Sequence, residues 1–225
     1  MTKTKSYRVG RSGGSVGLDA AWDSPAWKKV PALKVASFRP ESSEHRPKVQ
    51  VKLQHDGAGI CGAFKVEDQY VRCVASKFQD PVCLDSCVEF FVRPREDKGY
   101  INFEFSGDGT LLCKFIEDWT RVPGGFGKSV DLTPADGRQV SIWHSLPNIV
   151  EPEIAEPTTW YLSFRIPFAL LEKYIGPLGP VSGQEWRANF FKCGDRTSHP
   201  HWASWSPVDA LNFHLPHCFG RLVFE

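Results

Sequence analysis

Hydrophobic and polar residues alternate with a period of two along most of this chain. Val49, Val51 and Leu53 fall on one face of a predicted strand, and Asp56-Gly57 then turns the chain into a partner strand over 62–68. The same alternation recurs in later segments, at residues 87–93, 100–105, 111–115, 140–142, 160–166, 186–193 and 221–224. Strands at this spacing, separated by Gly, Asp and Pro, predict an all-β fold, an antiparallel β-sandwich of the jelly-roll or immunoglobulin-like kind.

One segment departs from this alternation. Pro167 followed by FALLEKY predicts a short helix near 167–175, with Pro at its start and Gly176-Pro177 at its end. Two Pro-rich stretches, 122–137 and 145–158, predict loops inside the domain, because strands resume after each. We therefore expect a single domain over 13–225, preceded by a flexible N-terminal tail over 1–12.

Composition narrows the classes of partner. The chain has 225 residues, of which 41% are hydrophobic and 24% charged, as in an ordinary globular protein. Its net charge of +1 leaves no basic surface that would attract nucleic acid or an anionic membrane. No run of about 18 apolar residues occurs. The sequence predicts neither a nucleic-acid partner nor a membrane partner.

The cysteines bear on the compartment. There are seven of them, an odd number without the repeated spacing of a small disulfide framework, which predicts buried free thiols. The N-terminus has no apolar segment typical of a signal peptide. Both features favour a cytoplasmic protein, and a secreted or periplasmic location is the alternative if a leader has been removed.

Three segments, taken in order, resemble the family-9 carbohydrate-binding modules and the wider DOMON-like group of β-sandwiches. They are the tryptophan pair of LDAAWDSPAW at 18–27, DSCVEFF at 85–91 and SWSPVDALNFHLPHCFGRLVF at 204–224. The resemblance covers the chain from Trp22 to Phe224. It implies an antiparallel β-sandwich that binds a saccharide without cleaving it, alone or beside a partner glycosidase.

The resemblance also implies particular site residues. Sugar-binding members of the family hold a terminal sugar between two tryptophans, and Phe213 falls at one of these positions. The other falls near 82–83, where neither residue is aromatic. Glu89 matches a sugar-bonding acid of the family, Glu104 falls near a bonding Arg, and Lys192 or its neighbour Phe191 near a bonding amide.

Strand parity supports a polar face independently of the resemblance. Glu89, Asn102 and Glu104 lie opposite the large apolar residues of their strands, and Arg187 and Asn189 share one parity in theirs. If these strands are neighbours, their carboxylates can accept hydrogen bonds from sugar diols, while Arg and Asn donate. The alternative is a solvated outer face with weak Glu–Arg pairs.

Aromatic residues predicted on loops would supply a stacking platform beside that face. Trp119 follows a predicted strand, Trp202 lies in SHPHWASW next to His201, and Phe213 lies in LNFHLP. An exposed ring there could stack on the apolar face of a sugar. The predicted carbohydrate-binding set is Glu89, Asn102, Glu104, Trp119, Arg187, Asn189, Lys192, His201, Trp202 and Phe213.

Other functions and bound groups are alternatives. A pair of carboxylates such as Glu89 and Glu104 could serve a glycoside hydrolase, and a protein-interaction domain could keep the scaffold without the sugar. Binding itself requires no cofactor, and no metal ligand is assigned. The resemblance admits structural Ca²⁺ near Glu67-Asp68 or Asp108, and bis-His haem. Soft zinc ligands gather near the C-terminus at Cys193, Asp195, His199, His201, His214, His217 and Cys218.

Overall fold

The computed structural model describes residues 4–14, 16–19 and 21–225. Strands make up most of its regular structure, which confirms the predicted all-β class. The strands are Ser6–Arg11 (β1), Leu33–Val35 (β2), Ser37–Phe38 (β3), Lys48–His55 (β4), Gly59–Asp68 (β5), Val71–Cys73 (β6), Cys87–Arg93 (β7), Tyr100–Ser106 (β8), Leu111–Val122 (β9), Gly125–Asp131 (β10), Ser141–His144 (β11), Val150–Ile154 (β12), Thr158–Pro167 (β13), Glu185–Cys193 (β14), Trp202–Ser204 (β15) and Gly220–Phe224 (β16). The helices are Pro134–Gly137 (α1) and Phe168–Ile175 (α2), with 3₁₀ turns at Val82–Leu84 and Pro216–Cys218.

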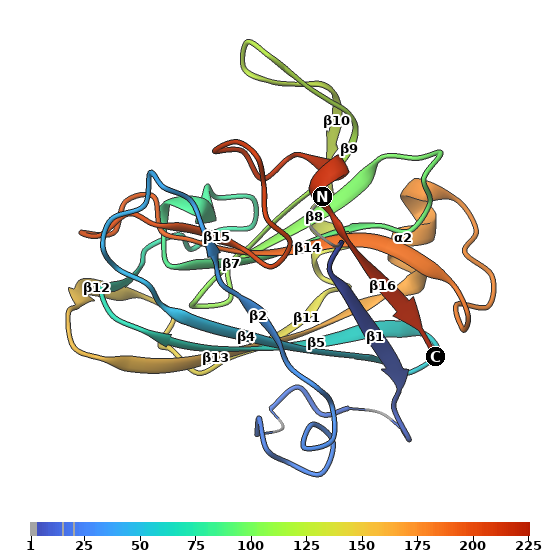
Figure 1. Cartoon of the computed structure of the whole chain (residues 1–225), viewed down its shortest axis with the longest axis horizontal. Helices are drawn as coiled ribbons and strands as arrows, with labels where there is room; N and C mark the ends of the chain where they lie inside the picture. Colours follow the sequence, from blue (N-terminus) through green and yellow to red (C-terminus); the bar gives the residue numbers. More distant parts are fainter. Residues whose placement is uncertain (1–3, 15, 20) are drawn as a thin grey trace.

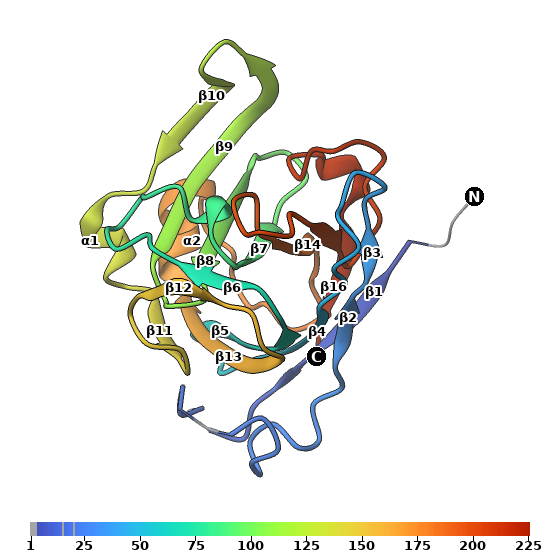
Figure 2. The ribbon, with the colours of Figure 1, turned by 90° about the vertical axis from the view of Figure 1, so that its left-hand side faces the viewer.

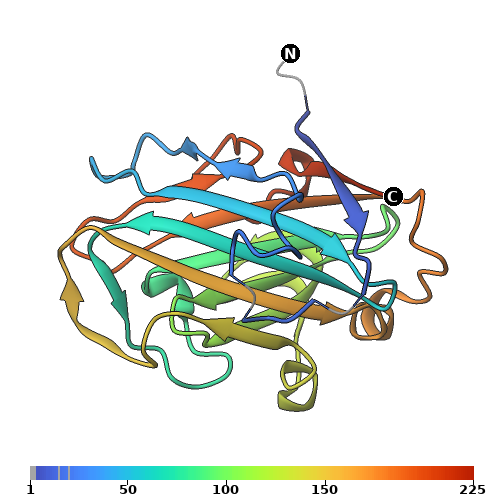
Figure 3. The ribbon, with the colours of Figure 1, turned by 90° about the horizontal axis from the view of Figure 1, so that it is seen from below.

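The strands form two packed layers (Figures 1 and 2). Sheet A has the strand order β10-β9-β8-β7-β14-β16, and short β15 pairs with the end of β14. Sheet B has the order β4-β5-β13-β11, with β2 beside β4, and Figure 3 shows β4, β5 and β13 running side by side. The pairings among these strands are antiparallel, as the alternating pattern predicted, and β1 is the exception described below.

The core between the layers is a stack of aromatic rings. Phe90 of β7 stacks on Phe190 of β14 with ring centroids 4.9 Å apart, and both belong to sheet A. Phe164 of sheet B stacks on Phe90 at 5.6 Å. Across the pair β5–β13, Gly62 lies under the Phe164 ring, so closely that an added Cβ would fall 2.2 Å from it. The absence of a side chain at this position therefore lets the ring lie flat in the core.

Strand β1 joins the two layers, which corrects the prediction of a flexible tail over 1–12. Ser6–Val9 pairs in parallel with β16 of sheet A, and Gly10 and Arg11 continue in parallel with β4 of sheet B. Tyr7 and Val9 are buried. The segment lacks a long apolar run, and its order comes from pairing with strands distant in sequence. Residues 1–3 lie outside the described residues.

Helix α2 confirms the helix predicted near 167–175. It buries Phe168, Leu170, Leu171 and Ile175 against the sandwich and ends at Gly176, whose φ of 84° suits glycine. Among the residues that the structure describes, no helix has the length and apolarity needed to cross a bilayer.

A long hairpin, β9–β10, projects beyond the sandwich (Figure 2). Its outer half is mostly exposed and shows no buried face, which is why the sequence predicted a loop over 122–137. Trp119 was expected on a loop because the exposed end of β9 shows no alternating pattern, but it lies within β9. The stretch 145–158, also expected as a loop, contains β12, which pairs with β6.

Candidate functional site

Three neighbouring strands of sheet A, β8, β7 and β14, carry the polar face that strand parity predicted. Glu89 of β7 stands directly opposite Glu104 of β8 on one side and Phe191 of β14 on the other. Asn102 lies two residues before Glu104 and shares its face. Because Phe90 and Phe190 fill the inner face of the same strands, these polar side chains point away from the core, to the outer face of sheet A.

A cavity of about 620 Å³ opens over this face, and we call it the outer-face cavity. Its floor is the outer face of β7, β8, β9 and β14, and its walls come from the β9–β10 hairpin and the loop over 205–219. Figures 1 and 2 show the hairpin and that loop rising from the same side of sheet A. It is lined by Cys83, Glu89, Asn102, Glu104, Leu112, Lys114, Arg121, Phe126, Cys193, Asp195, Trp202, Leu211, Asn212, Phe213 and His214.

The two glutamates at the floor are buried carboxyls. Burial, followed by the negative charge of Glu104, raises the pKa of Glu89 well above its usual range. Burial raises the pKa of Glu104 to about 7, although a hydrogen bond from Asn102 Nδ2 to its Oε1, at 2.6 Å, opposes the shift. The two carboxyls therefore hold protons up to near neutral pH. A protonated carboxyl offers a ligand an O–H donor as well as an oxygen acceptor.

Aromatic rings stand over this floor. Phe213 stacks on Phe191 with ring centroids 4.1 Å apart and planes 13° apart, so the wall continues the apolar surface of β14. Trp202 is fixed by a hydrogen bond from its Nε1 to Asp195 Oδ1 at 2.8 Å. Both rings remain partly exposed and line the cavity, where a ligand can reach them.

Polar side chains on the hairpin close the opposite wall. Arg121 lies over the Phe126 ring, 4.3 Å from its centroid, and Lys114 Nζ pairs with Asp131 at 2.5 Å. His214, which comes from the loop over 205–219, shares a hydrogen bond with Tyr100 Oη at 2.8 Å. Burial lowers the pKa of His214 to about 3, so its imidazole is neutral at physiological pH.

The cavity thus contains five of the predicted residues: Glu89, Asn102, Glu104, Trp202 and Phe213. The structure does not bring the other five to it. Trp119 lies farther out on β9, where its ring packs over Arg93 at 5.3 Å. Arg187 shares the parity of Phe191 but lies near the opposite end of β14, in a separate cavity with Asp209 and His217.

Asn189, Lys192 and His201 are also away from the cavity. The Asn189 amide is fully buried and occupied by the backbone of Ser206, to which it donates at 2.9 Å and from which it accepts at 2.9 Å. Lys192 has the opposite strand parity and points between the layers. Its Nζ donates to His201 Nε2 at 2.8 Å and lies 3.5 Å from Asp68 Oδ2.

Several lining residues were missed from the sequence. Leu112 and Lys114 pair directly with Glu104 and Asn102, so carrying the parity argument one strand further would have found them. Cys193 shares the parity of Phe191 and Asn189 on β14. Arg121, Phe126, Leu211 and His214 reach the cavity from long irregular or exposed segments, for which no sequence period applies.

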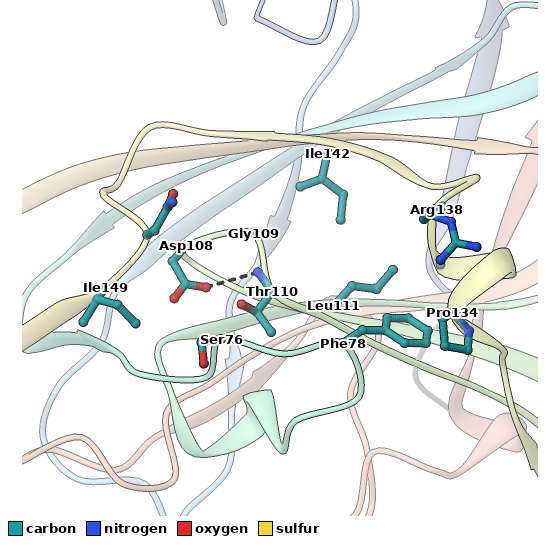
Figure 4. A pocket seen from close by; sticks show the side chains of 12 residues that line it. Ser76, Phe78, Asp108, Gly109, Thr110, Leu111, Pro134, Arg138, Ile142 and Ile149 are labelled. Atoms are coloured by element: carbon teal, nitrogen blue, oxygen red, sulfur yellow. Dashed lines mark hydrogen bonds between the residues drawn. The ribbon is translucent and has the colours of Figure 1, made fainter.

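The residues expected to hold calcium do not fit that ion. Asp68 Oδ1 already bonds His45, and its Oδ2 accepts from Trp160 Nε1 beside the Lys192 ammonium. Asp108 faces a second cavity of about 590 Å³ at the β8–β9 turn, where its Oδ1 accepts from the Thr110 amide (Figure 4). Among the residues that the structure describes, Asp108 is the single carboxylate lining that cavity, whereas calcium takes six to eight oxygens.

The soft ligands near the C-terminus are dispersed in the fold. His201 is bonded to Lys192, His214 to Tyr100, and His217 to Asp209. These residues therefore do not gather into one site: Cys193, His201 and the pair His217 and Cys218 fall in three separate groups of potential ligands among the described residues.

Comparison with known proteins agrees with this architecture. The sequence model of "Carbohydrate-binding family 9" matches residues 24–224, nearly the whole chain. The chain belongs to carbohydrate-binding family 9. No match is found among curated proteins.

Solved structures share the fold. A proposed carbohydrate-binding protein from Bacteroides uniformis ATCC 8492 has 28% sequence identity and a TM-score of 0.84, covering 99% of this chain and 100% of that one. A family-9 module from Caldicellulosiruptor kristjanssonii in complex with glucose has 14% identity and a TM-score of 0.59, over 97% and 95% of the chains. Its complex with cellotriose gives 15% identity and 0.61, over 98% and 94%.

Proposed function

We propose that this protein binds a saccharide, without cleaving it, in the outer-face cavity. The observation that carries the proposal is an aromatic wall over a polar floor. Phe213 and Trp202 offer partly exposed rings, while Glu89, Asn102 and Glu104 offer hydrogen-bonding groups below them. A sugar has an apolar face formed by its C–H groups and a rim of hydroxyls, so it can use both surfaces together.

The chemistry of each surface is complementary to a sugar. Stacking on Phe213 removes apolar surface from water and gains on the order of 1 kcal/mol beyond area burial. The N–H groups of the Asn102 amide and the Lys114 ammonium can donate hydrogen bonds to sugar hydroxyls, whereas the oxygens of the two glutamates can accept them. Because the floor is buried, a ligand lacking a matching hydroxyl would leave a polar group unpaired, and this gives selectivity.

The size of the cavity and the family membership support the same function. A volume of about 620 Å³ lies within the range of small-molecule sites. The module from Caldicellulosiruptor kristjanssonii, which shares this fold, was solved with glucose and with cellotriose. We therefore place a mono- or short oligosaccharide first among the candidate ligands.

A glycan array tests the proposal. The full chain is applied beside a Phe213→Ala/Trp202→Ala double variant, which removes both rings from the wall while sparing the polar floor. We expect the wild type to bind a chemically related set of glycans and the double variant to lose it. A wild type that binds no glycan, or a variant that binds the same set equally well, would contradict the proposal.

A further inference from the structure

The inner end of the outer-face cavity contains a cluster of soft ligands that saccharide binding does not require. Cys87 of β7 stands directly opposite Cys193 of β14, and Glu89 lies two residues further along β7 on the same face. The two sulfurs and a Glu89 carboxylate oxygen all lie within 4.8 Å of one another. The Cys193 thiol donates a hydrogen bond to Glu89 Oε1 at 3.2 Å.

A second observation shows that this cluster lacks a partner. Glu89 is 2% exposed, and its Oε2 is buried with no hydrogen-bond partner in the described structure. An unpaired carboxyl oxygen in such a place is costly whether or not it carries a proton, because buried polar groups are normally hydrogen-bonded or coordinate a metal. Glu89 and Cys193 both line the cavity, so an ion could enter from it.

We propose that Cys87, Glu89 and Cys193 bind a thiophilic divalent metal ion, with Zn²⁺ as the best match. Two thiolates and one carboxylate are a donor set that zinc prefers, whereas calcium and magnesium require oxygen ligands. On binding, the thiol protons and any proton on Glu89 pass to solvent, and the ion takes their place between the three side chains.

The spacing of the cluster suits tetrahedral zinc. Zinc–sulfur bonds of about 2.3 Å and zinc–oxygen bonds of about 2.0–2.2 Å put tetrahedral ligand atoms roughly 3.5–3.8 Å apart. The Cys193 Sγ–Glu89 Oε1 separation of 3.2 Å must lengthen by a few tenths of an ångström. The other separations, all within 4.8 Å, need to shorten by about 1.3 Å at most, which side-chain rotation can supply. Because Glu89 and Cys193 line the cavity, a water molecule from it can supply the fourth ligand.

Zinc binding can be measured without any saccharide, so this inference does not rest on the proposed function. The full chain is kept reduced, stripped with a chelator and titrated with Zn²⁺ by calorimetry, with bound metal counted after dialysis. A parallel titration with Co²⁺ reports thiolate ligation through its charge-transfer absorption. We expect one ion per chain and a thiolate–cobalt band.

Variants locate the site. Cys193→Ser and Glu89→Gln keep the size of the side chain but weaken the ligand, and each should lower zinc affinity at least tenfold. Cys61→Ser is the matched control, because Cys61 is an equally buried thiol in β5 of the other sheet. It should bind zinc as the wild type does. His217→Ala tests a separate group of potential ligands formed by Asp209, His217 and Cys218.

Three results would overturn the proposal. The wild type could take up no zinc, the cobalt complex could lack the thiolate band, or His217→Ala could abolish binding while Cys193→Ser and Glu89→Gln retain it. Circular dichroism checks that each variant folds. If Cys193→Ser does not fold, Glu89→Gln and the cobalt spectrum of the wild type still decide the outcome.

Discussion

Glu89 and Glu104 stand directly opposite each other on β7 and β8, with both side chains buried under the walls of the outer-face cavity. Like charges at directly opposed positions of a sheet repel, and burial adds the cost of removing each charge from water. The pair therefore favours protonated carboxyls, and it makes both the floor of the cavity and the stability of the fold sensitive to pH.

The contribution of Glu104 to stability should fall as the pH rises from about 5 to 8. The pKa of Glu104 is raised to about 7 from 4.5, so between these values the folded chain holds a proton that the unfolded chain has released. Stability is then present at low pH and lost as pH rises through 7, on the order of 1–3 kcal/mol. The buried imidazoles of His201 and His214, whose pKa burial lowers to about 3, act in the opposite sense, so Glu104 is isolated by comparison with a variant. Glu104→Gln can still accept from Asn102, and its free energy of unfolding in urea, relative to the wild type, should rise over this pH range.

Glu67→Gln is the control for that experiment, because Glu67 is a carboxylate at the surface that pairs with Lys48 and Lys65. It should leave the pH dependence of stability between pH 5 and 8 as it is in the wild type. A Glu104→Gln variant whose unfolding free energy varies with pH in the same way as that of the wild type would show that Glu104 does not titrate as described.

Removing the ring of Phe213 should weaken saccharide binding. Phe213→Ala deletes the surface that stacks on Phe191 at the rim of the cavity, and we expect a 5- to 50-fold loss of affinity, about 1–2 kcal/mol. Calorimetry with the best glycan of the array measures it. Trp119→Ala is the matched control, because that ring packs over Arg93 outside the cavity. An equal loss in both variants would point to a general effect on the fold.

The buried ion pair between the layers should be important for stability. Lys192 and Asp68 are both fully buried side chains, one from each sheet, with Nζ 3.5 Å from Oδ2. Lys192→Met leaves the Asp68 carboxylate with its His45, Trp160 and Gln69 backbone partners but without a buried cation, and we expect a loss of about 3–5 kcal/mol in urea unfolding. Lys48→Met, at an exposed pair, should change stability by less than about 1 kcal/mol.

A double-variant cycle separates pair energy from packing. Adding Asp68→Asn to Lys192→Met removes the uncompensated charge, so the double variant should be less destabilised than the sum of the two single ones. Simple additivity would mean that the two groups do not interact across the layers.

Deleting residues 1–11 should destabilise the whole sandwich. The deletion removes β1, unpairs one edge of β16 and takes the buried Tyr7 and Val9 out of the core. We expect a fall in Tm of about 10 °C or more in a thermal melt followed by circular dichroism. Trimming residues 1–3 alone provides the comparison and should leave Tm within a few degrees. A normal Tm after the longer deletion would contradict the bridging role of β1.

The sequence by itself determined the fold class and one face of the site. Alternating apolar residues in β7 and β8 fix which side chains enter the core, so Glu89, Asn102 and Glu104 could be placed together on the other face before the structure was known. Helix α2 was equally visible, because Pro167 and Gly176 bound a short apolar segment. Such features follow from local periods of the chain.

Only the tertiary structure decided the rest. The sequence interpretation put Lys192 and His201 in the site, whereas they bond to each other between the layers, with the Lys192 ammonium beside the buried Asp68 of the other sheet. It put a flexible tail where β1 pairs with strands distant along the chain. Pairing partners, buried charge networks and cavity walls depend on contacts between residues far apart in sequence, and a local pattern of side chains contains no information about which distant segment will supply them.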